Sequence, residues 1–331
     1  DGHLNQLNAD YFQHLDKLIA ILIDHGIVPV YNPVFQGFGW KGLSTLGAAA
    51  DPQEYARYTR YLIARYGAHP AMWLVSADGT GKERVTEPAG LEIEEWDAYG
   101  QPTGIHYSPF DDRKADWTDD PQFGFHYNRS YHDAAWLDFQ WCQTGHGGEH
   151  LPDKVRRMHD YMPTKAVANG EPTYERIGWW QGHEAWLNLT AGGTMGVVYG
   201  AGGLWNWKIA ADEPGWVDWC NSNNSWAEAI EFEGSRYVGF LSRALAGYDI
   251  TDMTKLPQVG PQAVGKPGEL YIVYLPEGGA VKLAGLEGKL PYQWFNPRTG
   301  EFAAAGMAGK KKLTAPSKEP WVLIAGRQMN L

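Results

Sequence analysis

Hydrophobic positions in the first 250 residues follow two patterns that alternate along the chain. Residues 11–25 carry apolar side chains at the spacing of a helix with one buried face, namely Leu15, Leu18, Ile19, Leu22 and Ile23. Residues 27–35, "IVPVYNPVF", are an almost unbroken apolar run, which is typical of a buried strand. The chain therefore begins with a predicted helix followed by a predicted strand.

The same alternation continues to about residue 247. It predicts further strands at 71–78, 104–110, 136–145 and 165–172, and a strand followed by a loop at 195–207. It predicts helices at 52–67, in an acidic segment before residue 104, and at 151–162, 182–192 and 225–247. The six predicted strands end near positions 35, 78, 108, 144, 171 and 200.

Strands that alternate with helices indicate a parallel sheet. Three strand–helix units separate Asp78 from Glu171, and 93 residues over three units give 31 residues per unit. A (β/α)8 TIM barrel uses about 31 residues per unit, so the spacing favours a barrel of which six units are visible. An open doubly wound sheet has similar spacing and stays open, but the early strands lack the glycine-rich dinucleotide motif.

After Gly247 the helical pattern stops. Short strands are predicted at 269–276, 280–286, 291–302 and 320–326, separated by Gly/Pro turns. This pattern is typical of a small all-β sandwich. The sequence therefore predicts two domains, a partial TIM barrel over residues 1–250 and a C-terminal β-sandwich over residues 251–331.

Composition excludes several classes of function. The chain has 331 residues and a formal net charge of −11, which argues against a nucleic-acid partner. It has no apolar stretch of membrane-spanning length. Its two cysteines, Cys142 and Cys220, lack metal-ligand spacing, and we expect neither a metal site nor a cofactor. Sixteen tryptophans and eighteen tyrosines suit surfaces that stack on sugar faces.

Polar residues follow the apolar runs, where a barrel places its functional groups. Two of them are carboxylates that come directly after apolar runs, Asp78 in "MWLVSAD" and Glu171 in "VANGEP". Two facing carboxylates are what glycoside hydrolysis requires, because one donates a proton and the other attacks the sugar or activates water. The remaining predicted substrate-binding residues are Asn32, His106, Gln143, His146, Tyr174, Glu175, Tyr199 and Trp205.

Three of these predictions carry an alternative. Glu175 either supports the catalytic pair or is an acid at a helix N-terminus. His106 and His146 either bind substrate hydroxyl groups or are packed residues at strand ends.

Several segments together resemble the apiosidase-like glycoside hydrolases of family 140. They are "NADYFQHLDKLIAILIDHGIVPVY", "RYTRYLIARYGAHPAMWLVSAD", "WLDFQWCQTGH", "KAVANGEPTYE" and "GGTMGVVYGAGGLWNW". The tail, with "YIVYLPEG", "WFNPRTGEF" and "PWVLIAG", resembles the collagen-binding-type β-sandwich that often follows that barrel.

The resemblance implies a retaining, exo-acting (β/α)8 enzyme, with Asp78 as acid/base and Glu171 as nucleophile. It also implies an oligosaccharide or polysaccharide substrate, such as terminal β-apiose on plant pectin side chains. Arabinofuranosides and galactofuranosides stay open as substrates. A secreted or periplasmic bacterial protein is expected, with its signal peptide outside this chain. If residues 27–35 are the third strand of the barrel, we expect an upstream segment or a second chain to supply the first two.

Two other functions compete with this hypothesis. "HGGEH", residues 146–150, matches a zinc-peptidase motif, but its two glycines disfavour the helix that the motif needs. A non-catalytic carbohydrate-binding protein would explain the aromatic residues and the β-sandwich equally well.

Overall fold

The structure, a computed structural model, describes residues 3–36, 49–79, 81, 83–107, 130–143, 152–175, 178–205, 209–210 and 224–329. The chain forms two compact units. The first comprises Asp1–Gln143 and Asp160–Ala166, and the second comprises Thr144–His159 and Val167–Leu331. Each unit is described by itself.

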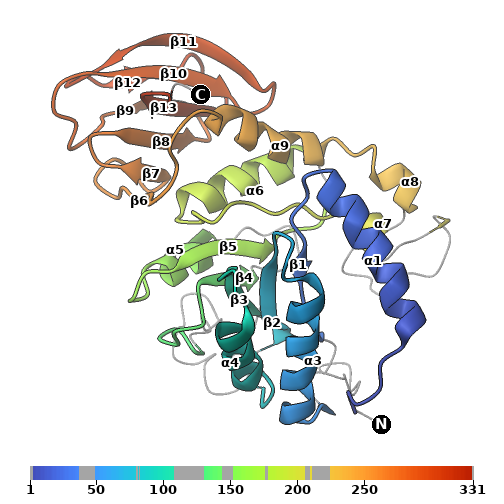
Figure 1. The fold of residues 1–331 in the computed structure, drawn as a ribbon. Coiled ribbons are helices and arrows are strands. Elements are labelled where there is room, and N and C mark those ends of the chain that lie inside the picture. Colours follow the sequence, from blue (N-terminus) through green and yellow to red (C-terminus); the bar gives the residue numbers. More distant parts are fainter. Residues whose placement is uncertain are drawn as a thin grey trace, which may run out of the picture. The chain divides into compact units, whose positions relative to one another are not determined.

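The first unit is built from strands and helices that alternate (Figure 1). In chain order they are α1 (Ala9–Asp24), β1 (Val30–Tyr31), α3 (Pro52–Tyr66), β2 (Met72–Gly79), α4 (Thr86–Trp96), β3 (Thr103–Tyr107) and β4 (Phe139–Gln143). The local sequence determines where α3 begins. Asp51 accepts hydrogen bonds from the backbone amides of Gln53 and Glu54, and Pro52 occupies the first turn, where its missing N–H costs nothing.

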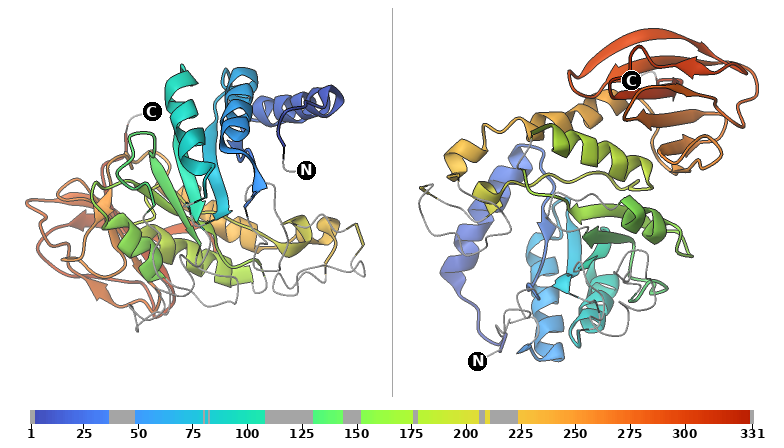
Figure 2. Two further views of the ribbon diagram at one scale, coloured as in Figure 1. Left: turned by 90° about the horizontal axis from the view of Figure 1, so that it is seen from below. Right: turned by 180° about the vertical axis from the view of Figure 1, so that it is seen from behind.

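A parallel sheet with the order β1-β2-β3-β4-β5 organises the mixed α/β part. In the pairing of β2 with β3, Ala77 lies opposite His106. In the pairing of β3 with β4, His106 lies opposite Trp141. The helices α3 and α4 lie side by side next to β2 (Figures 1 and 2). Tyr31 stacks on Tyr66 of α3 and on Trp73 of β2, with ring centroids 5.2 and 5.0 Å away, so aromatic contacts join the short strand β1 to its neighbours.

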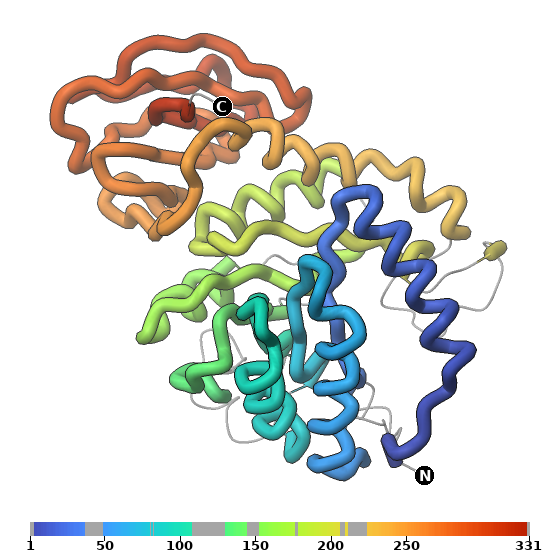
Figure 3. The backbone as a smooth tube through the Cα atoms, viewed as in Figure 1, coloured from blue at the N-terminus to red at the C-terminus, as the bar shows by residue number. Residues whose placement is uncertain are grey.

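The second unit combines helices with antiparallel sheets. Its first elements are α5 (Pro152–His159), β5 (Ala166–Glu171), α6 (Gly178–Thr190), α7 (Gly202–Trp205), α8 (Trp226–Ala229) and α9 (Gly234–Leu245). The strands of its antiparallel sheets are β6 (Thr254–Lys255), β7 (Ala263–Lys266), β8 (Leu270–Leu275), β9 (Ala280–Val281), β10 (Leu290–Asn296), β11 (Glu301–Ala308), β12 (Leu313–Thr314) and β13 (Trp321–Gly326). Figure 3 traces the chain from α9 directly into these strands.

These strands form a six-stranded sheet, β11-β10-β13-β8-β7-β6, and a two-stranded sheet, β12-β9. One face of the larger sheet, including Ile272 and Val322, packs in one core with Trp186 of α6 and Leu241 of α9. The opposite face forms a second core with the smaller sheet. Because β8 and β13 are covered on both faces, their sequences "LYIVYL" and "WVLIAG" are apolar at successive positions rather than alternating.

Several elements differ from the sequence-based prediction. The strand predicted at 27–35 is reduced to two residues, and the segment 291–302 divides into the hairpin strands β10 and β11. Residues 195–201 form no strand in the described structure, and Gly196 there has a φ of +129°, far from strand geometry. The helix predicted at 225–247 is two helices, because residues 230–233 leave the helix before Gly234 starts α9.

The described fold is therefore mixed α/β with a five-stranded parallel sheet and additional antiparallel sheets. The closed eight-stranded barrel and the domain boundary at residue 250 stay predictions. Among the described helices, none has the length and apolar character required to cross a membrane.

Candidate active site

The first candidate carboxylate, Asp78, lies near the carboxyl end of β2 in an unusual backbone conformation. Its φ is +54°, in the left-handed region that non-glycine residues seldom adopt. The pairing of β2 with β3 shifts register between Ala77 and Gly79, so Asp78 is the extra residue of a β-bulge. Bulges and positive φ values redirect a side chain out of the regular pleat, and both occur often at functional sites.

A glutamine that the sequence analysis did not identify holds the backbone beside Asp78. Oε1 of Gln36 accepts the backbone N–H of Ala77 at 2.7 Å, and the backbone N–H of Gln36 donates to the carbonyl of Ala77 at 3.0 Å. Gln36 is 6% exposed. These two bonds fix the residue that precedes Asp78, so they limit the positions that its carboxylate can take. No sequence motif marks Gln36, because it lies in the segment after β1 rather than at a strand end.

Three other predicted residues of the first unit lie at or just beyond strand ends. Asn32 follows β1, His106 lies in β3 opposite Ala77, and Gln143 is the last residue of β4. Oδ1 of Asn32 is buried and has no hydrogen-bond partner among the residues that the structure describes. The ring of His106 contacts that of Trp141 edge-on at a centroid distance of 6.1 Å. Gln143 is buried.

The second candidate carboxylate, Glu171, is the last residue of β5 and is partly exposed. The hydroxyl of Tyr174 donates a hydrogen bond of 2.7 Å to its Oε1. The Tyr174 ring lies 6.0 Å from that of Trp205, which is itself 37% exposed. A hydroxyl that donates to a carboxylate favours the charged form and fixes its orientation, as a nucleophile requires. The structure thus joins three of the predicted residues in one cluster.

The loop after β5 is anchored from α6. The backbone N–H of Thr173 donates to both carboxylate oxygens of Glu184, at 3.3 and 3.2 Å. Nε2 of Gln181 donates to the Thr173 carbonyl at 2.7 Å. Glu184 and Gln181 are 1% and 4% exposed. Because buried bonds of this kind are costly to break, the loop that carries Tyr174 is held in one conformation.

Glu175 takes part in a separate set of contacts. Its Oε1 accepts the backbone N–H of Gly234, the first residue of α9, at 2.9 Å, and its Oε2 accepts a hydrogen bond from the Tyr199 hydroxyl. Burial, followed by the bond to Glu175, raises the pKa of Tyr199, which therefore stays a neutral donor. A Cβ at position 234 would lie 2.4 Å from Oε2 of Glu175, so any other residue there would push the carboxylate out of its present position. This position fits one of the two expected roles of Glu175, an acid at a helix N-terminus.

We expect Glu175→Ala to lower the free energy of unfolding by about 2–4 kcal/mol, because it leaves the Gly234 amide and the Tyr199 hydroxyl without an acceptor. Thermal denaturation measures this, and Glu175→Gln, which keeps one acceptor oxygen, should cost less. If Glu175→Ala leaves the melting temperature unchanged but weakens saccharide binding, Glu175 is a substrate-binding residue instead.

The remaining predicted residue, His146, and the whole "HGGEH" segment lie outside the described residues. Within the described part of the chain, no group of three or more His, Cys, Asp or Glu residues could hold a metal ion.

One protein family matches the part of the chain that carries the predicted catalytic and substrate-binding residues. Residues 1–252 match the family model "Apiosidase-like, catalytic domain". The chain belongs to this apiosidase-like family. The matched segment contains Asp78, Glu171 and every predicted substrate-binding residue. A search of curated protein sequences found no match to the apiosidase-like chain.

Solved structures agree with this fold. The apiosidase-like chain superimposes on a glycoside hydrolase family 5 protein from Bacteroides vulgatus ATCC 8482 with a TM-score of 0.74 at 18% identity, over 98% of this chain and 76% of that one. A second structure, named only as a glycoside hydrolase, gives a TM-score of 0.72 at 18% identity and covers 98% and 78% of the two chains. At this identity the likeness concerns the fold alone.

Proposed function

We propose that this protein is a retaining, exo-acting glycoside hydrolase of the family 140 type. Membership of the apiosidase-like family supports a glycosidase that acts on carbohydrate. The observation that carries the proposal is the bond from the Tyr174 hydroxyl to Glu171 at the end of β5. This bond orients the Glu171 carboxylate, and a donated hydrogen bond favours the ionised form that attack on an anomeric carbon requires.

In this mechanism Glu171 attacks the anomeric carbon, and the bond to the leaving oxygen breaks as Asp78 transfers its proton to that oxygen. The product of this step is a glycosyl ester on Glu171. Asp78, now ionised, accepts a proton from water as the water attacks the same carbon and releases Glu171. Retention requires two carboxyl groups about 5–5.5 Å apart, whereas inversion requires about 6.5–9.5 Å, so the stereochemistry of the product tests the assignment.

Substrates with a terminal β-apiosyl group are the first choice for assay, since the matched family is apiosidase-like. Arabinofuranosides and galactofuranosides are the alternatives. A non-catalytic carbohydrate-binding function is the competing proposal. It differs in one respect, because a binding protein would hold the sugar without releasing it.

The deciding experiment is proton NMR of the reaction with aryl glycosides of these sugars, read before the free sugar equilibrates. We expect the first product to have the same anomeric configuration as the substrate, and only terminal monosaccharide to be released from oligosaccharides. An inverted product would exclude the double displacement. Saccharide binding with no turnover of any substrate in the panel would favour the non-catalytic function.

A further inference from the structure

The β-sandwich differs in charge from the rest of this acidic protein. Residues 251–331 contain ten Lys and Arg and six Asp and Glu, a net charge of +4. Residues 1–250 have a net charge of −15. An acidic protein repels anionic polymers in general, so a cationic domain at its C-terminus is the part that attracts them.

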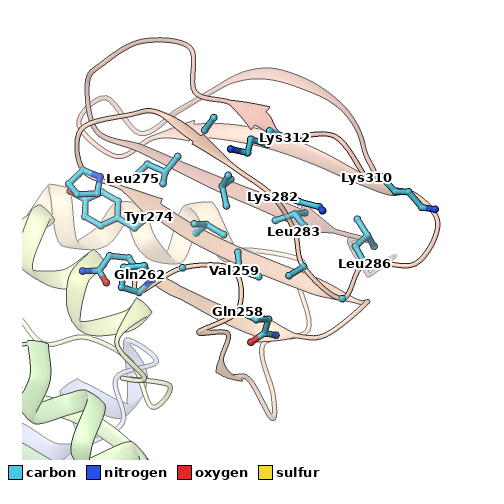
Figure 4. A pocket seen from close by; sticks show the side chains of 18 residues that line it. Gln258, Val259, Gln262, Tyr274, Leu275, Lys282, Leu283, Leu286, Lys310 and Lys312 are labelled. Carbon is cyan, nitrogen blue, oxygen red and sulfur yellow. The ribbon is translucent and has the colours of Figure 1, made fainter.

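A cleft of about 870 Å³ opens in this sandwich (Figure 4). One part of its lining comes from β8 and from the connection between β6 and β7. The other part comes from β9, from the segment that follows β9, and from the residues just before β12. Its apolar surface includes Val259, Leu283 and Leu286. The volume lies in the range of about 300–1,000 Å³ that is usual for small-molecule sites.

Three lysines line the cleft, Lys282, Lys310 and Lys312, and no carboxylate does. All three side chains are exposed, and within the described residues none of their ammonium groups has a hydrogen-bond or ion-pair partner. Figure 4 shows Lys282 near the middle of the cleft and Lys310 at one end. Gln262, also in the lining, has a buried Oε1 without a hydrogen-bond partner in the described structure. The cleft therefore carries free positive charge and no negative charge in its lining.

We propose that this cleft binds a carboxylate-bearing polysaccharide, with its uronate groups on the three lysines. The only aromatic residue in the lining, Tyr274, is 1% exposed, so the cleft lacks the open ring on which neutral sugars stack. No arginine lines it, and the planar fork of arginine is what favours phosphate. Lysines are point charges on flexible stems, which suit carboxylates spaced along a chain, and the partly exposed Val259 can contact the C–H face of a sugar ring.

Binding of this kind would not require Glu171. Its effect would be to hold the enzyme on an acidic polymer and raise the local concentration of side chains that the active site can cleave. Turnover of small aryl glycosides would not change.

The test is calorimetric titration of the full chain with polygalacturonate oligomers, in parallel with their methyl esters, which have the same backbone without the charge. We expect binding to the acid form, weakened by salt, and little binding to the ester. The triple variant Lys282→Gln, Lys310→Gln and Lys312→Gln should bind the acid form about tenfold or more weakly. The matched control is Lys289→Gln, Lys318→Gln and Arg327→Gln, which removes the same charge from residues outside the cleft.

Equal loss of affinity in the two triple variants would mean general charge attraction and would overturn the proposal. So would equal affinity for the methyl ester, equal affinity for double-stranded DNA, or no binding of polygalacturonate by the wild type. Glu171→Gln separates this proposal from the catalytic one, because that variant should bind polygalacturonate as the wild type does even if no glycosidase activity is found.

Discussion

Glu171→Gln is expected to lower kcat on an aryl glycoside by a factor on the order of 10⁴ or more, as removal of a nucleophile does in other hydrolases. The substitution keeps one side-chain oxygen as acceptor for the Tyr174 hydroxyl, so the cluster and the melting temperature should be preserved. Glu94→Gln, at an exposed position of α4, is the matched control and should have wild-type activity.

A second variant shows whether Glu171 itself attacks the sugar. Glu171→Gly leaves space for azide, which can form the bond to the anomeric carbon while the aryl oxide departs. The glycosyl azide should have the opposite anomeric configuration to the substrate, because only one displacement occurs. Substantial activity of Glu171→Gln, or an azide product of retained configuration from Glu171→Gly, would assign the nucleophile to another residue.

Asp78→Asn is expected to lower kcat/KM by about 10²–10⁴-fold on substrates with a poor leaving group. The loss should be much smaller with a dinitrophenyl leaving group, which departs without a proton. Asparagine tolerates a φ of +54° better than most residues, so this variant tests the carboxyl group without straining the backbone. Asp133→Asn, which is exposed in the same unit, is the matched control.

Azide also distinguishes the two carboxylates. In Asp78→Gly the nucleophile is intact, so azide attacks the glycosyl ester on Glu171 and the azide product should retain the substrate configuration. Asp78→Ala should be less stable than Asp78→Gly by about 1 kcal/mol, since alanine pays a steric cost in the left-handed region. Equal rate losses for good and poor leaving groups in Asp78→Asn would remove Asp78 from the role of proton donor.

The strands and helices with the strongest patterns could be predicted from the sequence alone. The helix predicted at 52–67 is α3, Pro52–Tyr66, and the strand predicted at 71–78 is β2, Met72–Gly79. The helix α3 has its own N-cap and a regular apolar face, and the strand β2 is a continuous apolar run. The strand predicted from residue 195 to about residue 200 is wrong, because Gly196 adopts a positive φ that no apolar count reveals.

The sequence by itself determined which residue types follow the strands, including Asp78 and Glu171, and that the tail would be all β. Only the tertiary structure decided what those residues contact. Tyr174 donates to Glu171 from three positions away, Gln36 holds Ala77 from 41 positions away, and Glu175 binds an amide 59 positions later in the chain. Periodicity reports which side of an element is buried, whereas partners brought together by folding depend on geometry that no local pattern records.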